Sequence, residues 1–105
     1  MKLESIISRI DLQVDQLADL CRRYQVNELA LFGSVLRDDF RPDSDIDVLV
    51  TFEPTAKIGF IAFNRMQREL SDLLGRPVDL VPKNGLKPLI KQDVLAEAEV
   101  IYASQ

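Results

Sequence analysis

Histidine is absent from the 105-residue chain, and this absence limits the chemistry that the protein can carry out. Without histidine the chain cannot build a Ser-His-Asp triad, a histidine-containing zinc site or the usual imidazole general base. The single cysteine, Cys21, excludes an intramolecular disulfide and indicates a reducing compartment. Cys21 lies on the apolar stripe of a predicted helix without a charged activator, so we predict a core thiol and not a nucleophile.

Long apolar runs and an excess of basic charge are missing as well. No stretch approaches the roughly 18 apolar residues of a membrane span, and the first residues lack a signal-peptide pattern, so we expect a cytoplasmic protein without membrane association. The net charge of −4 argues against a general nucleic-acid binder, which normally has a basic face. With 47% hydrophobic residues the chain can bury a core, and its length fits one domain, residues 1–105.

Apolar residues at alternating steps of three and four predict three helices. The first covers residues 3–24 and either packs on the sheet or also supports self-association. The second covers residues 56–74 and ends at Gly75, a favourable residue just after a helix. The third covers residues 87–102 and starts at Lys87-Pro88, although residues 98–102 could instead form a short edge strand. We expect the apolar face of this last helix to contain Leu89, Ile90, Val94 and Leu95.

Short apolar segments between these helices predict strands. Residues 26–32 form the first, and its continuous apolar run Leu29-Ala30-Leu31-Phe32 is typical of a strand covered on both faces. Residues 45–52 and 77–82 form the next two. Helices alternating with a few strands place the chain in the α/β (α+β) class, with helices packed on a small sheet.

Two aspartates, Asp45 and Asp47, enter the second strand. Side chains two residues apart in a strand point to the same face, about 6.5 Å apart. Aspartate is depleted in strands and adjacent like charges repel, so we expect a divalent cation to offset these carboxylates. Residues 37–47 contain five aspartates against two arginines, a segment that attracts cations and repels a polyphosphate unless metal accompanies it.

The pair Gly33-Ser34 follows the first strand and predicts a phosphate-binding corner. Glycine lets the backbone approach a phosphate, and the amides that open a helix donate hydrogen bonds to it. Ser34 can also act as the cap of that short helix. Arg37 either neutralises phosphate charge or pairs with the aspartates beside it. Ser44 either braces Asp45 or is a plain turn residue.

Lys83 and Lys87 are two further cationic side chains in the last third of the chain. Either could reach a triphosphate or a partner. Solvated surface lysines are the simpler interpretation, and we adopt it.

The spacing of these motifs resembles a known signature. Gly33-Ser34, ten residues and Asp45-Ile46-Asp47 are similar to the G-S-x10-D-x-D pattern of the DNA polymerase beta-like nucleotidyltransferases. The local form, with Arg37 and Ser44, resembles the minimal nucleotidyltransferase (MNT) proteins in particular. The resemblance covers residues 28–102. It implies the polymerase beta-like fold, a small mixed sheet of three or four strands, with the catalytic core in residues 28–82.

This resemblance also implies a site and a reaction. Asp45, Asp47 and, from the neighbouring strand, Asp79 would be the catalytic carboxylates and would hold two Mg²⁺ ions, or Mn²⁺. Gly33 and Ser34 would hold the phosphates of ATP. MNT proteins are antitoxins that transfer AMP from ATP to a tyrosine of a HEPN-domain toxin. The same activity is therefore implied here, with a homo- or hetero-oligomer as the working form.

Two other functions remain open at this point. The chain could neutralise its partner by occlusion, as a binding module without catalysis. It could also keep the nucleotidyl transfer chemistry and act on a small molecule such as an antibiotic.

Overall fold

The computed structural model describes residues 13–36 and 45–104. They form a four-stranded mixed sheet of order β3-β2-β1-β4, which confirms the predicted α/β class with a small mixed sheet. The strands are β1 (Val26–Phe32), β2 (Ile46–Phe52), β3 (Val78–Pro82) and β4 (Glu99–Ala103). The helices are α2 (Val14–Arg23), α3 (Phe60–Leu74) and α4 (Pro88–Glu97), with short 3-10 turns η1 (Gly33–Leu36) and η2 (Lys83–Gly85).

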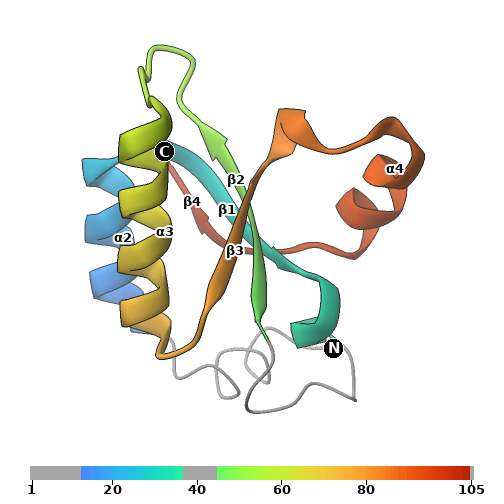
Figure 1. The fold of residues 1–105 in the computed structure, drawn as a ribbon, viewed down its shortest axis with the longest axis horizontal. Coiled ribbons are helices and arrows are strands. Elements are labelled where there is room, and N and C mark those ends of the chain that lie inside the picture. Colours follow the sequence, from blue (N-terminus) through green and yellow to red (C-terminus); the bar gives the residue numbers. More distant parts are fainter. Residues whose placement is uncertain (1–12, 37–44, 105) are drawn as a thin grey trace.

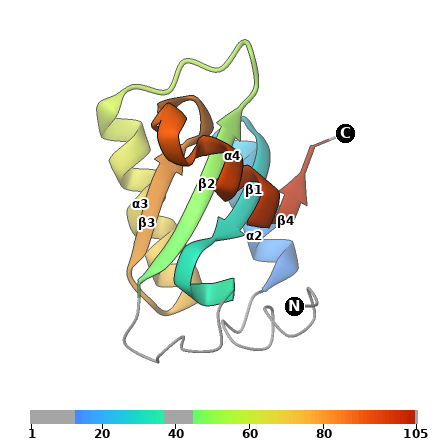
Figure 2. The ribbon, with the colours of Figure 1, turned by 90° about the vertical axis from the view of Figure 1, so that its right-hand side faces the viewer.

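The helices divide between the two faces of the sheet. Helices α2 and α3 lie side by side against one face, and α4 lies over the other, which it shares with turn η1 (Figures 1 and 2). The main core lies under α2 and α3, where apolar side chains from strands and helices are fully buried. This core includes Leu17, Cys21, Leu29, Leu31, Ile46, Val48, Val50, Met66 and Leu70. The second face of the central strands is also covered, since Ala30 and Leu49 are buried.

Strand pairing sets which residues become neighbours. Strands β1 and β2 are antiparallel, with Leu31 opposite Val48 and Phe32 opposite Asp47. Strand β3 is parallel to β2, with Ile46 opposite Val78. A parallel pair requires a crossover connection, which the loop after β2 and α3 provide. Strand β4 pairs antiparallel with β1 at the other side of the sheet.

Helix α3 differs from its prediction at one end only. It begins at Phe60 and not at residue 56, because residues 56–59 are not helical: the backbone of Gly59 is extended, and Ile58 packs against the core from this segment. It ends as predicted, with Gly75 in the left-handed conformation at φ +70°.

The C-terminal helix predicted for residues 87–102 ends at Glu97, and the alternative of a short edge strand over residues 98–102 is confirmed. Ala98 is extended, and the chain continues as strand β4. β-Branched and aromatic residues such as Val100, Ile101 and Tyr102 favour a strand, and the edge of β1 supplies backbone partners for it. None of the residues predicted for the apolar face of this helix is fully buried, and Leu89 is 91% exposed.

The N-terminal helix can be compared over part of its predicted length. Residues 3–12 lie outside the described residues, and α2 covers the remainder of the prediction to Arg23. Leu17 and Cys21 are buried as the apolar stripe predicts, whereas Val14 is 55% exposed at the start of the helix. Within residues 13–36 and 45–104, none of the helices has the length and apolarity to cross a membrane.

The buried thiol of Cys21 gives a test of this core. Burial raises the pKa of Cys21 from its ordinary 9.0 to about 12, and the Arg22 charge offsets this only in part. We expect a thiol reagent at pH 8 to react with the chain only after urea unfolds it. Between about pH 9 and 12 the unfolded thiol ionises while the folded one stays neutral, so the unfolding free energy should fall as pH rises. Rapid labelling of the folded chain at pH 8 would contradict this core position.

Candidate functional site

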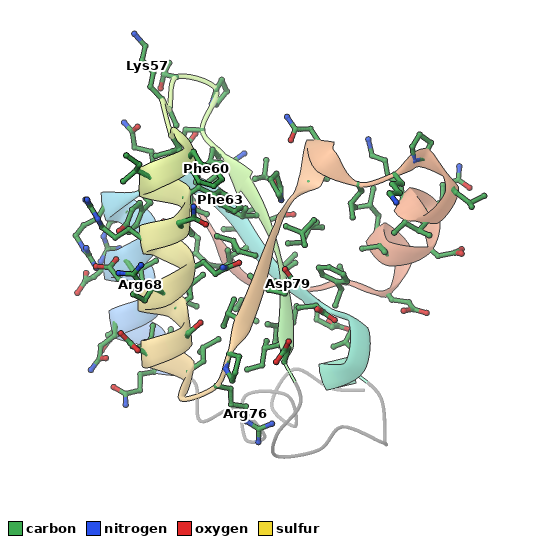
Figure 3. All side chains as sticks on the ribbon, viewed as in Figure 1. Lys57, Phe60, Phe63, Arg68, Arg76 and Asp79 are labelled. Carbon is green, nitrogen blue, oxygen red and sulfur yellow. The ribbon has the colours of Figure 1, made fainter. Side chains whose placement is uncertain are left out.

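Two of the predicted carboxylates are brought together by the parallel pairing of β2 and β3. Asp47 and Asp79 are direct partners in the register of these strands. Neighbouring strands lie about 4.8 Å apart, so the two side chains leave the same face at adjacent positions. Val78 and Leu80 are buried under α3, so alternation turns Asp79 to the opposite face, where it is exposed (Figure 3).

Asp45 lies just before β2 and two residues from Asp47. Alternation therefore directs it to the same face as Asp47, at the exposed end of the strand. The amide N–H of Ile46, between the two aspartates, donates a 2.9 Å hydrogen bond to the carbonyl oxygen of Pro77 at the start of β3. This bond fixes the alignment of the strand that carries Asp45 and Asp47 with the strand that carries Asp79.

Gly33 forms the other side of the site. It ends β1 at φ +76°, a left-handed conformation that other residues rarely adopt. A Cβ atom at Gly33 would overlap the Oδ2 of Asp47 and lie 3.0 Å from its Cγ. Only glycine therefore allows the turn η1 and the half-buried carboxylate of Asp47 to approach each other this closely. Ser34 follows within η1, a turn that lies on the same sheet face as α4 (Figure 2).

A hollow of about 490 Å³ opens beside these residues. It is lined by Phe32 and Asp47 from the sheet, by Gly33 of η1, and by Ile90, Asp93, Val94 and Glu97 from α4. Its volume is in the range of small-molecule sites. Asp93 and Glu97 were not predicted as site residues. Their spacing of four places them on one helix face, but this pattern is too common to indicate a site.

Two other hollows of similar volume in the described part of the chain lack this combination. One of about 460 Å³ is lined by residues of α2 and α3, the helices on the sheet face opposite to α4. Another of about 420 Å³ is lined by Lys83 and Lys91 together with the last residues of β2. Lys83 is thus at the opposite end of β2 from Asp45. Lys87 is exposed at the start of α4. Arg37 and Ser44 lie outside the described residues.

The chemistry of the three carboxylates fits a hard divalent cation, which prefers oxygen ligands. As the side chains stand, no three acidic, cysteine or histidine residues of the described part converge closely enough to hold a metal ion. Carboxylates repel one another until a cation neutralises them. Rotation of these side chains about the fixed Asp47–Asp79 backbone pair would be needed to close around an ion.

The chain matches known nucleotidyltransferases over most of its length. The nucleotidyltransferase domain family matches residues 15–101. The protein adenylyltransferase MntA of Thermococcus cleftensis is 40% identical over 84 residues, which are 80% of this chain and 81% of that protein. A candidate protein adenylyltransferase of Methanocaldococcus jannaschii is 42% identical over 84 residues, 79% of this chain and 82% of the relative.

Solved structures share the fold. A candidate minimal nucleotidyltransferase superposes with a TM-score of 0.69 at 36% identity, covering 94% of this chain and 95% of the other. A complex of a tri-AMPylated HEPN toxin with an MNT antitoxin from Shewanella oneidensis gives a TM-score of 0.62 at 22% identity. The match covers 88% of this chain and 71% of the other. At the lower identity this likeness concerns the fold alone.

Two glycines provide a matched test of the Gly33 corner. Gly75 has nearly the same left-handed φ, +70°, but a Cβ there meets no atom within 4 Å. Gly75→Ala should therefore lower the unfolding free energy by about 1–2 kcal/mol, the usual cost of left-handed backbone. Gly33→Ala should cost more, because Asp47 must also move. Urea unfolding of both variants measures the difference, and equal losses would show that the Asp47 contact is unimportant.

Proposed function

This chain belongs to the nucleotidyltransferase domain family, and on that premise we propose that it transfers AMP from ATP to a hydroxyl group of a partner protein. The protein is a nucleotidyltransferase. Beyond this family activity, the proposal specifies the nucleotide donor, the acceptor group and the residues that carry out the transfer. A reaction that consumes ATP on a protein partner would take place in the cytoplasm.

One observation carries the proposal, the placement of Asp79 directly opposite Asp47 beside Gly33. Nucleotidyl transfer requires mainly positioning and charge neutralisation and little covalent work by the protein. Two carboxylates at paired positions of neighbouring strands, with Asp45 two residues before Asp47 and a glycine turn alongside, provide acidic groups next to backbone amides. This arrangement supports a site for a cation-bound triphosphate.

In the proposed reaction the acceptor hydroxyl oxygen forms a bond to the α-phosphorus of ATP. The bond from that phosphorus to the bridging oxygen breaks, and pyrophosphate leaves with the electron pair. Gly33 and Ser34 bind the β- and γ-phosphates through backbone amides. Asp79 accepts the hydroxyl proton, a role for which a carboxylate is suited in a chain without histidine.

Asp45, Asp47 and Asp79 would hold the divalent cations, with Mg²⁺ as the expected ion and Mn²⁺ as a substitute. When bound, such ions neutralise the triphosphate and favour the ionised acceptor oxygen. We infer two ions, because one would stabilise the ionised attacking oxygen and the other the leaving oxygen, on which negative charge builds up. Asp45 and Asp47 would hold the ions together with the triphosphate. Asp79 would complete the coordination of the ion nearest the acceptor.

The acceptor we propose is a tyrosine of a HEPN-type toxin, which would make this chain the antitoxin of the pair. Relatives named as protein adenylyltransferases support a protein acceptor. So do the apolar side chains of Leu89 and Ile90, which are exposed on the helix that lines the hollow beside Asp47. Exposed apolar groups at a site favour contact with a protein over contact with a small polar molecule.

The proposal predicts that Asp45→Asn combined with Asp47→Asn abolishes AMP transfer, because neutral amides bind divalent cations far more weakly than carboxylates do. Asp79→Asn alone should lower the rate by about 100-fold or more, the scale of losing a preorganised electrostatic group. The measurement is incubation with labelled ATP, Mg²⁺ and the proposed HEPN-type toxin, followed by mass spectrometry of both proteins. Asp72→Asn, an exposed aspartate of α3 on the other side of the sheet, is the matched control.

The same variants separate this function from its alternatives. If the double variant still binds the toxin and still neutralises it, neutralisation occurs by occlusion and the catalytic proposal fails. If label appears on an added small molecule and never on the toxin, the acceptor is wrong while the chemistry stands.

A further inference from the structure

The outer edge of strand β3 is bonded to side chains of helix α3. The amide N–H of Val78 donates to Oγ of Ser71 at 3.0 Å, and the amide N–H of Leu80 donates to Oε1 of Gln67 at 2.9 Å. These amides flank Asp79 on its two sides. Since β3 is the last strand of the sheet beside β2, such amides would otherwise face solvent or another strand.

Both hydrogen bonds can form at once because the spacing of the two helix residues matches the spacing of the two strand residues. Gln67 and Ser71 are four residues apart, about 6 Å along a helix. Val78 and Leu80 are two residues apart, about 6.6 Å along a strand. The chain reverses at Gly75, so the earlier helix residue meets the later strand residue. Ser71 is itself held, since its hydroxyl donates to the carbonyl oxygen of Gln67 at 2.9 Å.

We propose that Gln67 and Ser71 are positioning residues that clamp β3 on both sides of Asp79 and so fix its carboxylate beside Asp47. The inference rests on the proposed function, because it assigns to Asp79 the ion nearest the acceptor. Asp79 is exposed, and its position is set by the backbone of an edge strand that only β2 supports from within the sheet. The clamp supplies the support from the outer side.

The test compares substitutions that remove the acceptor atom with substitutions that keep it. Gln67→Met has similar length without an oxygen, whereas Gln67→Glu retains one. Gln67→Met should lower kcat about tenfold and raise the Mg²⁺ concentration for half-maximal rate by a similar factor, the scale of losing a group that orients a metal ligand. The KM for ATP should stay within about twofold, because Asp45 and Asp47 are undisturbed.

Gln67→Glu should restore kcat and the Mg²⁺ dependence to within about threefold of the original chain. Ser71→Ala and Ser71→Thr form a second pair with the same logic, which covers the case in which Gln67→Met does not fold. Gln16→Met, at an exposed position of α2, is the control for a glutamine replaced away from β3. In all variants, amide hydrogen exchange at Val78 and Leu80 reports whether the clamp is open.

Separate outcomes distinguish the two proposals. A chain that binds Mg²⁺ in calorimetry but transfers no AMP to any acceptor defeats the proposed function. In that case the loss of Mg²⁺ affinity in Gln67→Met and its return in Gln67→Glu still support the clamp. Unchanged Mg²⁺ affinity and unchanged kcat in Gln67→Met and Ser71→Ala, with faster exchange at the two amides, would overturn the clamp. So would an equal loss in Gln67→Met and Gln67→Glu.

Discussion

The parallel pairing of β2 with β3 is the constraint on which the site depends. It makes Asp79 the direct neighbour of Asp47, although a loop and a whole helix separate them in the chain. Parallel strands need such a crossover, and here α3 covers the core face while leaving the opposite face to the carboxylates. The helix that buries Met66 and Leu70 therefore also bonds the edge of the strand carrying Asp79. Core packing and site geometry depend on the same element.

Close packing at Gly33 shows how little freedom the site has. The left-handed backbone turns the chain into η1 at the point where Asp47 occupies the space of a missing side chain. A backbone that approaches a carboxylate so closely can bring its amides near the same ligand. In a chain without histidine, acidic groups and such amides can carry out phosphate chemistry at this corner without an imidazole.

Helix α4 distinguishes this site from a bare sheet face. Its side chains Ile90, Asp93, Val94 and Glu97 close one side of the hollow beside Asp47, while Leu89 stays exposed. A helix with apolar residues directed to solvent next to a site provides a surface for a second protein. The family relationship and this surface together make protein modification a more economical interpretation than small-molecule modification.

Local pattern was sufficient for much of this protein. Continuous apolar residues located β1 and β2, Gly75 marked the end of α3, and the spacing of Gly33 to Asp47 indicated the family, because each depends on residues close in sequence. Other features depend on elements distant in sequence. These features are the strand formed by residues 98–102, the exposure of Leu89, the position of Asp93 and Glu97 beside the hollow, and the hydrogen bonds from β3 to Gln67 and Ser71. Burial and hydrogen bonding at these positions follow from which strand edge or helix face is left unpaired after the sheet assembles, and only the tertiary structure decides that.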